Sequence, residues 1–242
     1  MKKLFLILLK NDLRGISRDP MSFFIALLPL LLALLFRFLI PWITDLLRPL
    51  LDLSGLDSLW LGFLIMAGPI MFGWVGGILL LDEKDQNLSP VLLVTPAPTV
   101  LRLAVKSIFP ALSALPGTFL IILISGMAPP YLKEYWLVAV LAALQAPLMT
   151  LLIYGVASSK LQGITFAKAL TLLYMPPLLV PFFASPLVHL SALSPPYWTL
   201  GAFRAAVEGT RGFWFFFLGG IVYSLLLLTL LFRMAKRKLL RG

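Results

Sequence analysis

Six apolar segments of about twenty residues, each almost free of charge, dominate this sequence of 242 residues. An α-helix rises about 1.5 Å per residue, so about 20 apolar residues cross the roughly 30 Å hydrocarbon core of a bilayer. Inside lipid, backbone amides must find partners within their own segment, which makes each segment a helix. We therefore predict an all-α polytopic membrane protein. The expected transmembrane helices are Ser22–Ile40, Ser58–Leu81, Ser107–Met127, Tyr135–Val156, Ala169–Leu190 and Phe213–Phe232.

Residues 1–20, which precede the first of these segments, carry a different pattern. Apolar side chains recur on one helical face and basic side chains cluster on another, which is typical of a helix lying in the membrane surface. The Asp19-Pro20 pair is expected to end this helix before the first transmembrane segment. We therefore expect an amphipathic interfacial N-terminal helix followed by six transmembrane helices, in one transmembrane domain that covers residues 1–242.

The basic residues are unevenly distributed among the segments that join the expected helices. Fifteen of the 20 Lys and Arg residues fall in the two terminal segments and in the 82–106 and 157–168 loops, whereas the acidic residues divide evenly. Cytoplasmic loops carry an excess of Lys and Arg, so both termini are predicted to lie in the cytoplasm of a plasma-membrane protein. The net charge of +10 then favours contact with anionic lipid rather than with nucleic acid.

The expected helices contain few groups that could carry out chemistry. The interiors of the second to sixth segments contain no Asp, Glu, Lys or Arg, which disfavours a proton relay or an ion site within the bilayer. The chain has a single histidine, His189, no cysteine and no phosphate-binding G-x-x-x-x-G-K-[ST] loop. We expect no metal site, no cofactor and no catalytic residue in this chain. Energy for uphill transport would have to arrive from outside the bilayer.

A short element bounded by prolines lies between the second and third expected helices. Ser89 can cap a helix whose first turn holds Pro90, and Pro96 disfavours helix at Thr95. The product is a short helix with apolar sides at the cytoplasmic face. Exposed apolar surface of this kind usually binds a partner, although packing against its own bundle or against lipid is the alternative. The residues of this element are Leu88, Ser89, Pro90, Val91, Leu92, Leu93, Val94, Thr95 and Pro96.

Three carboxylates, Asp82, Glu83 and Asp85, follow the second expected helix. Negative charge is unfavourable at a helix C-terminus, where the backbone carbonyls already point outward. These acids should therefore find cations, and the basic N-terminal segment with Arg14 and Arg18 is expected on the same side of the membrane. We predict a cytoplasmic charge cluster of these five residues, with a solvated helix end as the alternative.

Three stretches of the sequence carry a resemblance to a known family. They are LKNDLRGISRDPMSFF at 9–24, DEKDQNLSPVLLVTPAPTVLRLAVKSI at 82–108, and the proline-rich fifth segment followed by PPYWTLGAFRAAVEG at 195–209. Their order and spacing resemble the permease subunit of type-2 ATP-binding cassette (ABC) transporters, a family of drug, lipid and polysaccharide exporters. The first stretch is similar to the family's amphipathic N-terminal helix and the second to its first cytoplasmic loop. The resemblance covers nearly the whole chain.

The resemblance implies that residues 88–96 form a coupling helix that sits in a cleft of a separate cytoplasmic ATPase subunit. It implies two copies of that ATPase, which would hold ATP and Mg. It also implies a second permease beside the first, most simply as a homodimer, with a similar but different permease as the alternative. Closure of the ATPases would drive alternating access and export of an apolar or amphipathic, drug-like or lipid-like substrate.

The resemblance further implies that the second and fifth helices line the substrate pathway. Each candidate lining residue is equally compatible with an ordinary core or lipid-facing position. The candidates are Met66, Phe72, Trp74, Met175 and Phe182. The second helix also contains Gly73-x-x-x-Gly77, a spacing of small residues that lets helices approach closely, either within the chain or at a dimer seam.

Two other classes of function remain open from the sequence. A non-transporting membrane scaffold or assembly factor needs no motor, but it also has no need of a capped apolar element at 88–96. An intramembrane enzyme would need acids or histidines at membrane depth, and the sequence lacks them there. The sequence therefore favours the membrane half of an ATP-driven exporter.

Overall fold

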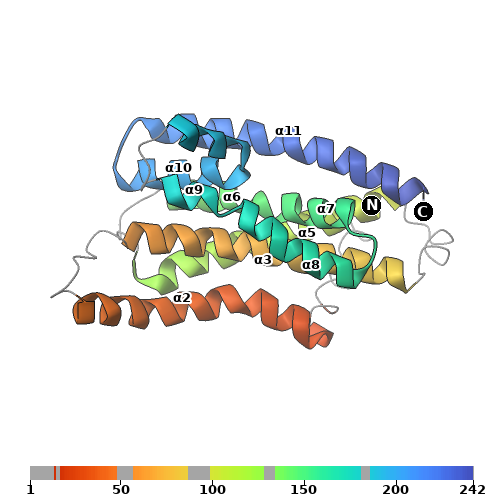
Figure 1. Cartoon of the computed structure of the whole chain (residues 1–242), viewed down its shortest axis with the longest axis horizontal. Helices are drawn as coiled ribbons and strands as arrows, with labels where there is room; N and C mark the ends of the chain where they lie inside the picture. Colours follow the sequence, from red (N-terminus) through yellow and green to blue (C-terminus); the bar gives the residue numbers. More distant parts are fainter. Residues whose placement is uncertain are drawn as a thin grey trace.

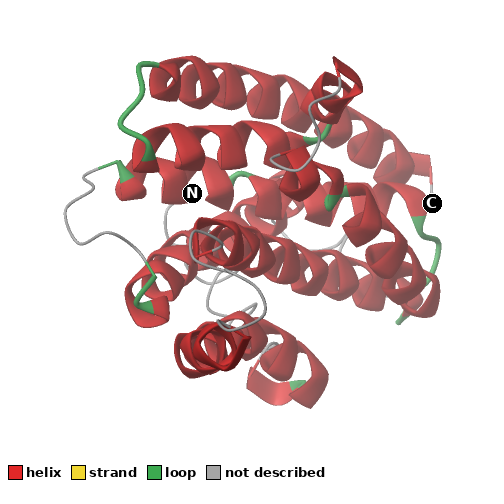
Figure 2. Cartoon of the chain, turned by 60° about the vertical axis from the view of Figure 1, so that its left-hand side comes forward, coloured by secondary structure: helices red, strands yellow, loops and turns green. Residues whose placement is uncertain are grey.

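The structure, a computed structural model, describes Arg14 and residues 17–47, 57–86, 99–127, 134–180 and 186–241. These residues form helices joined by short connections, with no strand in the part described, so the all-α prediction is confirmed (Figure 2). The helices are α2 (Pro20–Leu47), α3 (Asp57–Asp85), α5 (Thr99–Ser125), α6 (Tyr135–Ala143), α7 (Gln145–Val156), α8 (Lys160–Leu173), α9 (Pro176–Leu179), the 3₁₀-helix η2 (Pro186–Leu193), α10 (Pro195–Val207) and α11 (Gly212–Arg241).

Five helices in the described part are long and apolar enough to cross a membrane. Each overlaps one of the expected transmembrane helices, and α6 and α7 together supply the fourth. They run between the same two ends of the molecule, as expected of a polytopic membrane protein (Figure 1). The five are Pro20–Leu47, Asp57–Asp85, Val100–Ser125, Tyr135–Val156 and Gly212–Leu239.

The segment predicted as the fifth transmembrane helix, 169–190, is not one continuous helix. It is divided among α8, α9 and η2, and residues 181–185 lie outside the described part. Pro176 and Pro177 supply no amide hydrogen to the turn before them, and that turn tightens: Tyr174 and Met175 donate to carbonyls three residues earlier. The chain still passes from one end of the bundle toward the other, with α8 along α3 (Figure 1).

Helix α3 is the centre of the bundle. Within its 18-residue apolar stretch, 78% is buried inside the protein. Its glycines let α7 and α5 approach closely. A Cβ at Gly73 would lie 2.6 Å from the carbonyl oxygen of Ala146, one at Gly76 2.5 Å from Pro110 Cγ, and one at Gly77 2.9 Å from Ile153 Cβ. Of the two interpretations of the Gly73-x-x-x-Gly77 spacing, the structure therefore favours packing within the chain.

Helices α2 and α11 form the outside of the bundle. Only 17% of the 18-residue apolar stretch of each helix is buried, against 78% of the corresponding stretch in α3. In a membrane protein such uniformly apolar, exposed faces meet lipid or another transmembrane surface. On its inner face α11 packs against α10, where Gly219 and Gly220 make room for the Trp198 ring.

Candidate functional site at the basic end of the bundle

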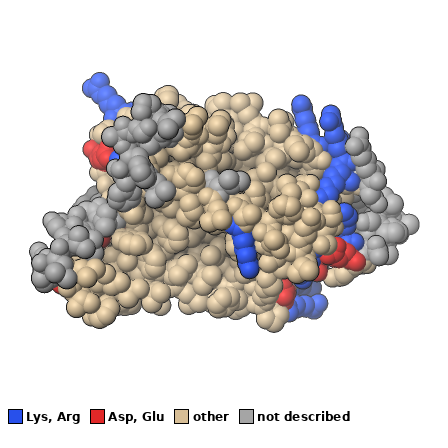
Figure 3. Space-filling view, in the orientation of Figure 1, with Lys and Arg blue, Asp and Glu red and all other residues tan. Residues whose placement is uncertain are grey.

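Lys and Arg side chains gather at one end of the molecule, on the right in Figure 3. We call this the basic end; it is formed by the C-terminal ends of α3, α7 and α11 and the N-terminal ends of α5 and α8. The segregation of charge predicted from the sequence is therefore present in the folded chain. The predicted coupling element, residues 88–96, belongs to the 87–98 segment between α3 and α5, and this segment lies outside the described residues.

Glu83 joins the two helix ends that bracket this loop. One carboxylate oxygen lies 2.6 Å from Lys106 Nζ and the other 3.9 Å from Arg102 Nη2. The two basic side chains are 10% and 12% exposed, and Glu83 is 28% exposed. Ion pairs with this much burial are screened less by salt than surface pairs, and removing one partner leaves a desolvated charge. The C-terminal end of α3 and the start of α5 are thus held together independently of the loop itself.

Asp82 and Asp85 join the same end of α3 to the start of α8. Asp82 Oδ1 lies 3.0 Å from Lys160 Nζ, and Asp85 Oδ2 accepts a hydrogen bond of 2.7 Å from the backbone amide of Lys160. The first amides of a helix lack partners inside that helix and favour a nearby anion. Two carboxylates that are unfavourable at the C-terminus of α3 therefore stabilise the N-terminus of α8, where Ser159 also accepts from the amide of Gln162.

The predicted charge cluster is brought together in part. Its three acids lie at the basic end and have cationic partners, but the described partners are Lys106, Arg102 and Lys160. Arg14 and Arg18 are exposed, and in the described part of the chain no ion pair joins them to these acids. Lys160 lies 78 positions from Asp82, so only the folded arrangement of α3 and α8 could identify it.

Lys238 makes a second connection at the basic end that the sequence did not single out. Its Nζ donates to the carbonyls of Tyr154 at 2.6 Å, Gly155 at 3.3 Å and Ala157, and lies 5.3 Å from the centre of the Tyr154 ring. These carbonyls end α7, where a cation is favoured by the orphan oxygens and the helix dipole. Lys238 thus attaches the end of α11 to the turn between α7 and α8.

The start of α2 is fixed by a helix cap. Asp19 Oδ2 accepts from the Ser22 amide at 3.2 Å and from the Ser22 hydroxyl at 2.5 Å, and Pro20 opens the helix. The hydroxyl hydrogen bond, above all, holds the pKa of the Asp19 carboxyl below its usual range. The helix boundary predicted at Asp19-Pro20 is where α2 begins.

Four of the five candidate pathway residues lie in the described part of the chain, and all four are buried or half-buried. Met66 is 2% exposed inside the bundle. Phe72 is half-buried against Gly117 of α5, and Trp74 is half-buried with its Nε1 lacking a hydrogen-bond partner among the described residues. Met175 is half-buried just after α8, and Phe182 lies outside the described part. A lining role for these residues stays a prediction, and for Met66 it requires the helices to separate.

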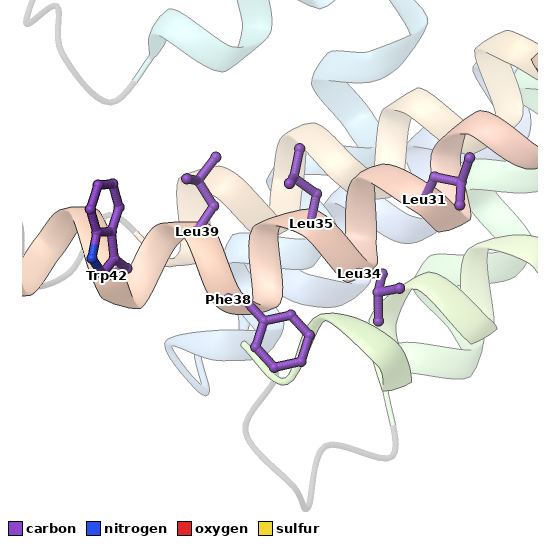
Figure 4. Close-up of a pocket in the computed structure, with 6 residues that line it drawn as sticks. All are labelled: Leu31, Leu34, Leu35, Phe38, Leu39 and Trp42. Atoms are coloured by element: carbon purple, nitrogen blue, oxygen red, sulfur yellow. The ribbon is translucent and has the colours of Figure 1, made fainter.

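A groove on the outer face of α2 is an apolar surface that the sequence did not single out. It is a shallow, open depression of about 520 Å³ lined by Leu31, Leu34, Leu35, Phe38, Leu39 and Trp42 (Figure 4). All six side chains come from α2, and none carries a charge. Apolar acyl chains or another apolar helix would match this surface. Elsewhere, the described residues contain no cluster of three or more His, Cys, Asp or Glu side chains that could hold a metal ion.

Comparison with known proteins identifies relatives across nearly the whole chain. The family model described as "Rv2686c-like: Fluoroquinolones export permease protein Rv2686c-like" matches residues 12–232. Two similar proteins are "Fluoroquinolones export permease protein MT2760" of Mycobacterium tuberculosis strain CDC 1551 / Oshkosh and "Fluoroquinolones export permease protein Rv2686c" of strain H37Rv. Each is 32% identical over 239 residues, which cover 95% of this chain and 92% of the relative. No solved structure matches the chain significantly.

Proposed function

Since the chain belongs to the Rv2686c-like family of export permeases, we propose that it is the membrane-spanning subunit of an ATP-driven exporter. The membrane half has no motor of its own, so ATP and Mg would be bound by two copies of a separate cytoplasmic ATPase. The permease would work as a pair, most simply a homodimer, in the plasma membrane with both termini in the cytoplasm. The non-transporting scaffold is the alternative that the test below must separate.

The observation that carries this proposal is the arrangement around residues 87–98. Glu83 holds the two helix ends that bracket this segment, while Asp82 and Asp85 attach α8 beside them. A force applied to the bracketed segment would therefore reach α3, the buried centre of the bundle, and through it α7 and α8. A coupling element requires a mechanical connection of this kind, because an ATPase can shift the bundle only by binding one conformation better than another.

The substrate proposed is an apolar or amphipathic, drug-like molecule. The names of the two relatives refer to the export of fluoroquinolones, and this supports a drug-like substrate for the present chain. The candidate lining residues, with their thioether and aromatic side chains and without formal charge, suit such a substrate better than an inorganic ion.

The test is the double substitution Leu92→Asp/Leu93→Asp in the predicted coupling element. Two carboxylates on its apolar side should abolish co-purification of the ATPase while the purified permease keeps the helical content and thermal unfolding of the wild type. The matched control is Leu46→Asp/Leu47→Asp, which changes two adjacent leucines next to Asp45 in the last turn of α2, at the end of the bundle opposite the basic end, and should leave ATPase binding intact. Undiminished ATPase binding by the first variant would exclude residues 88–96 as the coupling element.

A further inference from the structure

Helix α11 is longer than the membrane it crosses. Its 30 residues, at about 1.5 Å each, span about 45 Å, whereas the hydrocarbon core of a bilayer is about 30 Å thick. The excess lies at the basic end, where the last turns carry Arg233, Lys236, Arg237 and Lys238 (Figures 1 and 3). These turns therefore occupy the depth of the lipid headgroups and of the adjoining water.

On the exposed face of α11, a row of apolar side chains is followed directly by cationic side chains. Val222, Leu226 and Leu230 are exposed and follow one another at intervals of four residues. Arg233 and Arg237, also exposed, come next on the same face at intervals of three and four. The two guanidinium groups thus stand directly above a surface that faces the acyl chains, with the exposed Met234 beside them.

No acid of the described chain neutralises these cations. The acids at the basic end are engaged elsewhere: Asp82 with Lys160, Glu83 with Lys106, and Asp85 with the start of α8. Within the described ranges, no ion pair involves Arg233, Lys236 or Arg237. Lys238 differs from these three because it turns inward and caps α7. Among the residues that the structure describes, the outer three therefore form a positive surface without an acidic partner, at headgroup depth.

We propose that Arg233, Lys236 and Arg237 form a binding site for the phosphate of an anionic phospholipid in the leaflet at the basic end. An arginine fork can donate two parallel hydrogen bonds to phosphate oxygens, while the lysine contributes a flexible point charge. The exposed leucines below the site hold the acyl chains of the same lipid. Two requirements for lipid recognition, an apolar wall and an anion-binding rim, are met on one face of one helix.

Lipid bound at this site would also affect the rest of the basic end. Arg237 immediately precedes Lys238, which attaches α11 to the end of α7. A headgroup that holds Arg233 and Arg237 would keep the last turn of α11 helical and in place. The attachment of α11 to the α7–α8 turn should therefore be firmer in anionic than in zwitterionic lipid. This inference concerns the lipid surface and does not depend on which substrate is transported.

The experiment places the purified full chain in nanodiscs that contain phosphatidylglycerol and phosphatidylcholine in equal amounts. Native mass spectrometry then measures which lipid stays bound when the disc is removed. The wild type should retain phosphatidylglycerol preferentially, and Arg233→Gln/Arg237→Gln should reduce that preference at least about fivefold. The matched control, Arg204→Gln/Arg211→Gln, removes the same charge from exposed positions at the opposite end and should match the wild type.

One further variant and one further condition keep the outcome unambiguous. Arg233→Lys/Arg237→Lys retains the charge but loses the bidentate fork, so its preference should lie between those of the wild type and the glutamine variant. Unchanged helical content and thermal unfolding of the glutamine variant show that its loss of preference is not a folding defect. Added inorganic phosphate should fail to displace the lipid, because the apolar wall contributes to binding. An unchanged lipid preference in Arg233→Gln/Arg237→Gln, or displacement by phosphate alone, would overturn the proposal.

Discussion

At the scale of single residues, the basic end is organised by a few carboxylates that each join two helices. Glu83 is the most buried of these contacts, because Lys106 and Arg102 are nearly covered while the carboxylate stays partly open. Desolvation makes such a pair costly to break, whereas an exposed pair contributes little. The chain contains both a largely buried and an exposed ion pair, so the stabilities that the two pairs contribute can be compared within one protein.

Glu83→Gln should lower the free energy of unfolding by about 1–3 kcal/mol, because it removes the carboxylate that faces two largely buried cations, Lys106 and Arg102. The measurement is thermal or denaturant unfolding of the purified protein in detergent, with Lys106→Gln and the double variant completing a mutant cycle. Glu208→Gln is the control: the Arg204–Glu208 pair is 3.7 Å apart with both side chains about half exposed, and its loss should cost under about 0.5 kcal/mol. Equal effects of the two substitutions would contradict the role assigned to Glu83.

Asp19 gives a prediction about pH. Its pKa in the folded chain is lowered, chiefly by the Ser22 hydroxyl hydrogen bond, so its contribution to stability is complete above the unfolded-state pKa and is lost as the pH falls through the folded-state pKa. Asp19→Ala should therefore be less stable than the wild type by about 1 kcal/mol at neutral pH. The difference between the two unfolding curves should shrink when the pH is lowered to about 3. A difference that stays constant over this range would show that the carboxylate charge is not what caps α2.

At the scale of elements, the seam between α3 and α7 depends on the absence of side chains. A Cβ at Gly73 would lie 2.6 Å from a backbone oxygen that cannot rotate away, and the Thr150 hydroxyl donates to the Gly73 carbonyl across the same seam at 3.0 Å. Close approach of this kind replaces the hydrophobic driving force that is missing between helices in lipid.

Gly73→Ala should therefore destabilise the protein by about 2 kcal/mol or more, although alanine favours helix over glycine by about 1 kcal/mol. Gly155→Ala in α7 is the matched control, since no atom lies within 4 Å of its Cβ position; it should be neutral or stabilising. Unfolding should show the loss at every protein concentration, because the seam lies within one chain. A loss that appeared only as reduced dimerisation would contradict this packing.

The elements also show where sequence patterns are sufficient and where they fail. Long apolar runs in the sequence predicted five spanning helices correctly. A segment can cross the hydrocarbon core as a helix if it is long and apolar enough, and both properties are local to the sequence. The fifth predicted helix, at 169–190, was wrong as a continuous helix, because the turn before Pro176 and Pro177 tightens at Tyr174–Met175 and the helix ends there. The start of α8 at Lys160, inside an expected loop, depends on Ser159 and on Asp85, a residue 75 positions away.

At the scale of the whole molecule, most Lys and Arg side chains of the described part gather at the basic end, as the sequence predicted (Figure 3). The charge pairs themselves were only half predictable. The acids could be recognised by their unfavourable place at a helix end, but their partners Lys160 and Lys106 emerge only when α3, α5 and α8 are assembled. The burial of Met66 likewise could not be predicted from the sequence. On a helix that is apolar all round, no sequence pattern distinguishes a residue of the core from one that lines a substrate pathway.

At this scale, the permease is expected to be one part of an ATP-driven assembly. The test is a purification of the tagged chain from its native membrane in a mild detergent, followed by quantitative mass spectrometry of the proteins that accompany it. A soluble chain with a phosphate-binding G-x-x-x-x-G-K-[ST] loop should accompany the permease in a one-to-one ratio and should be released by Leu92→Asp/Leu93→Asp. A folded, dimeric permease that carries no such chain would overturn the proposed role as an exporter subunit and favour a membrane scaffold.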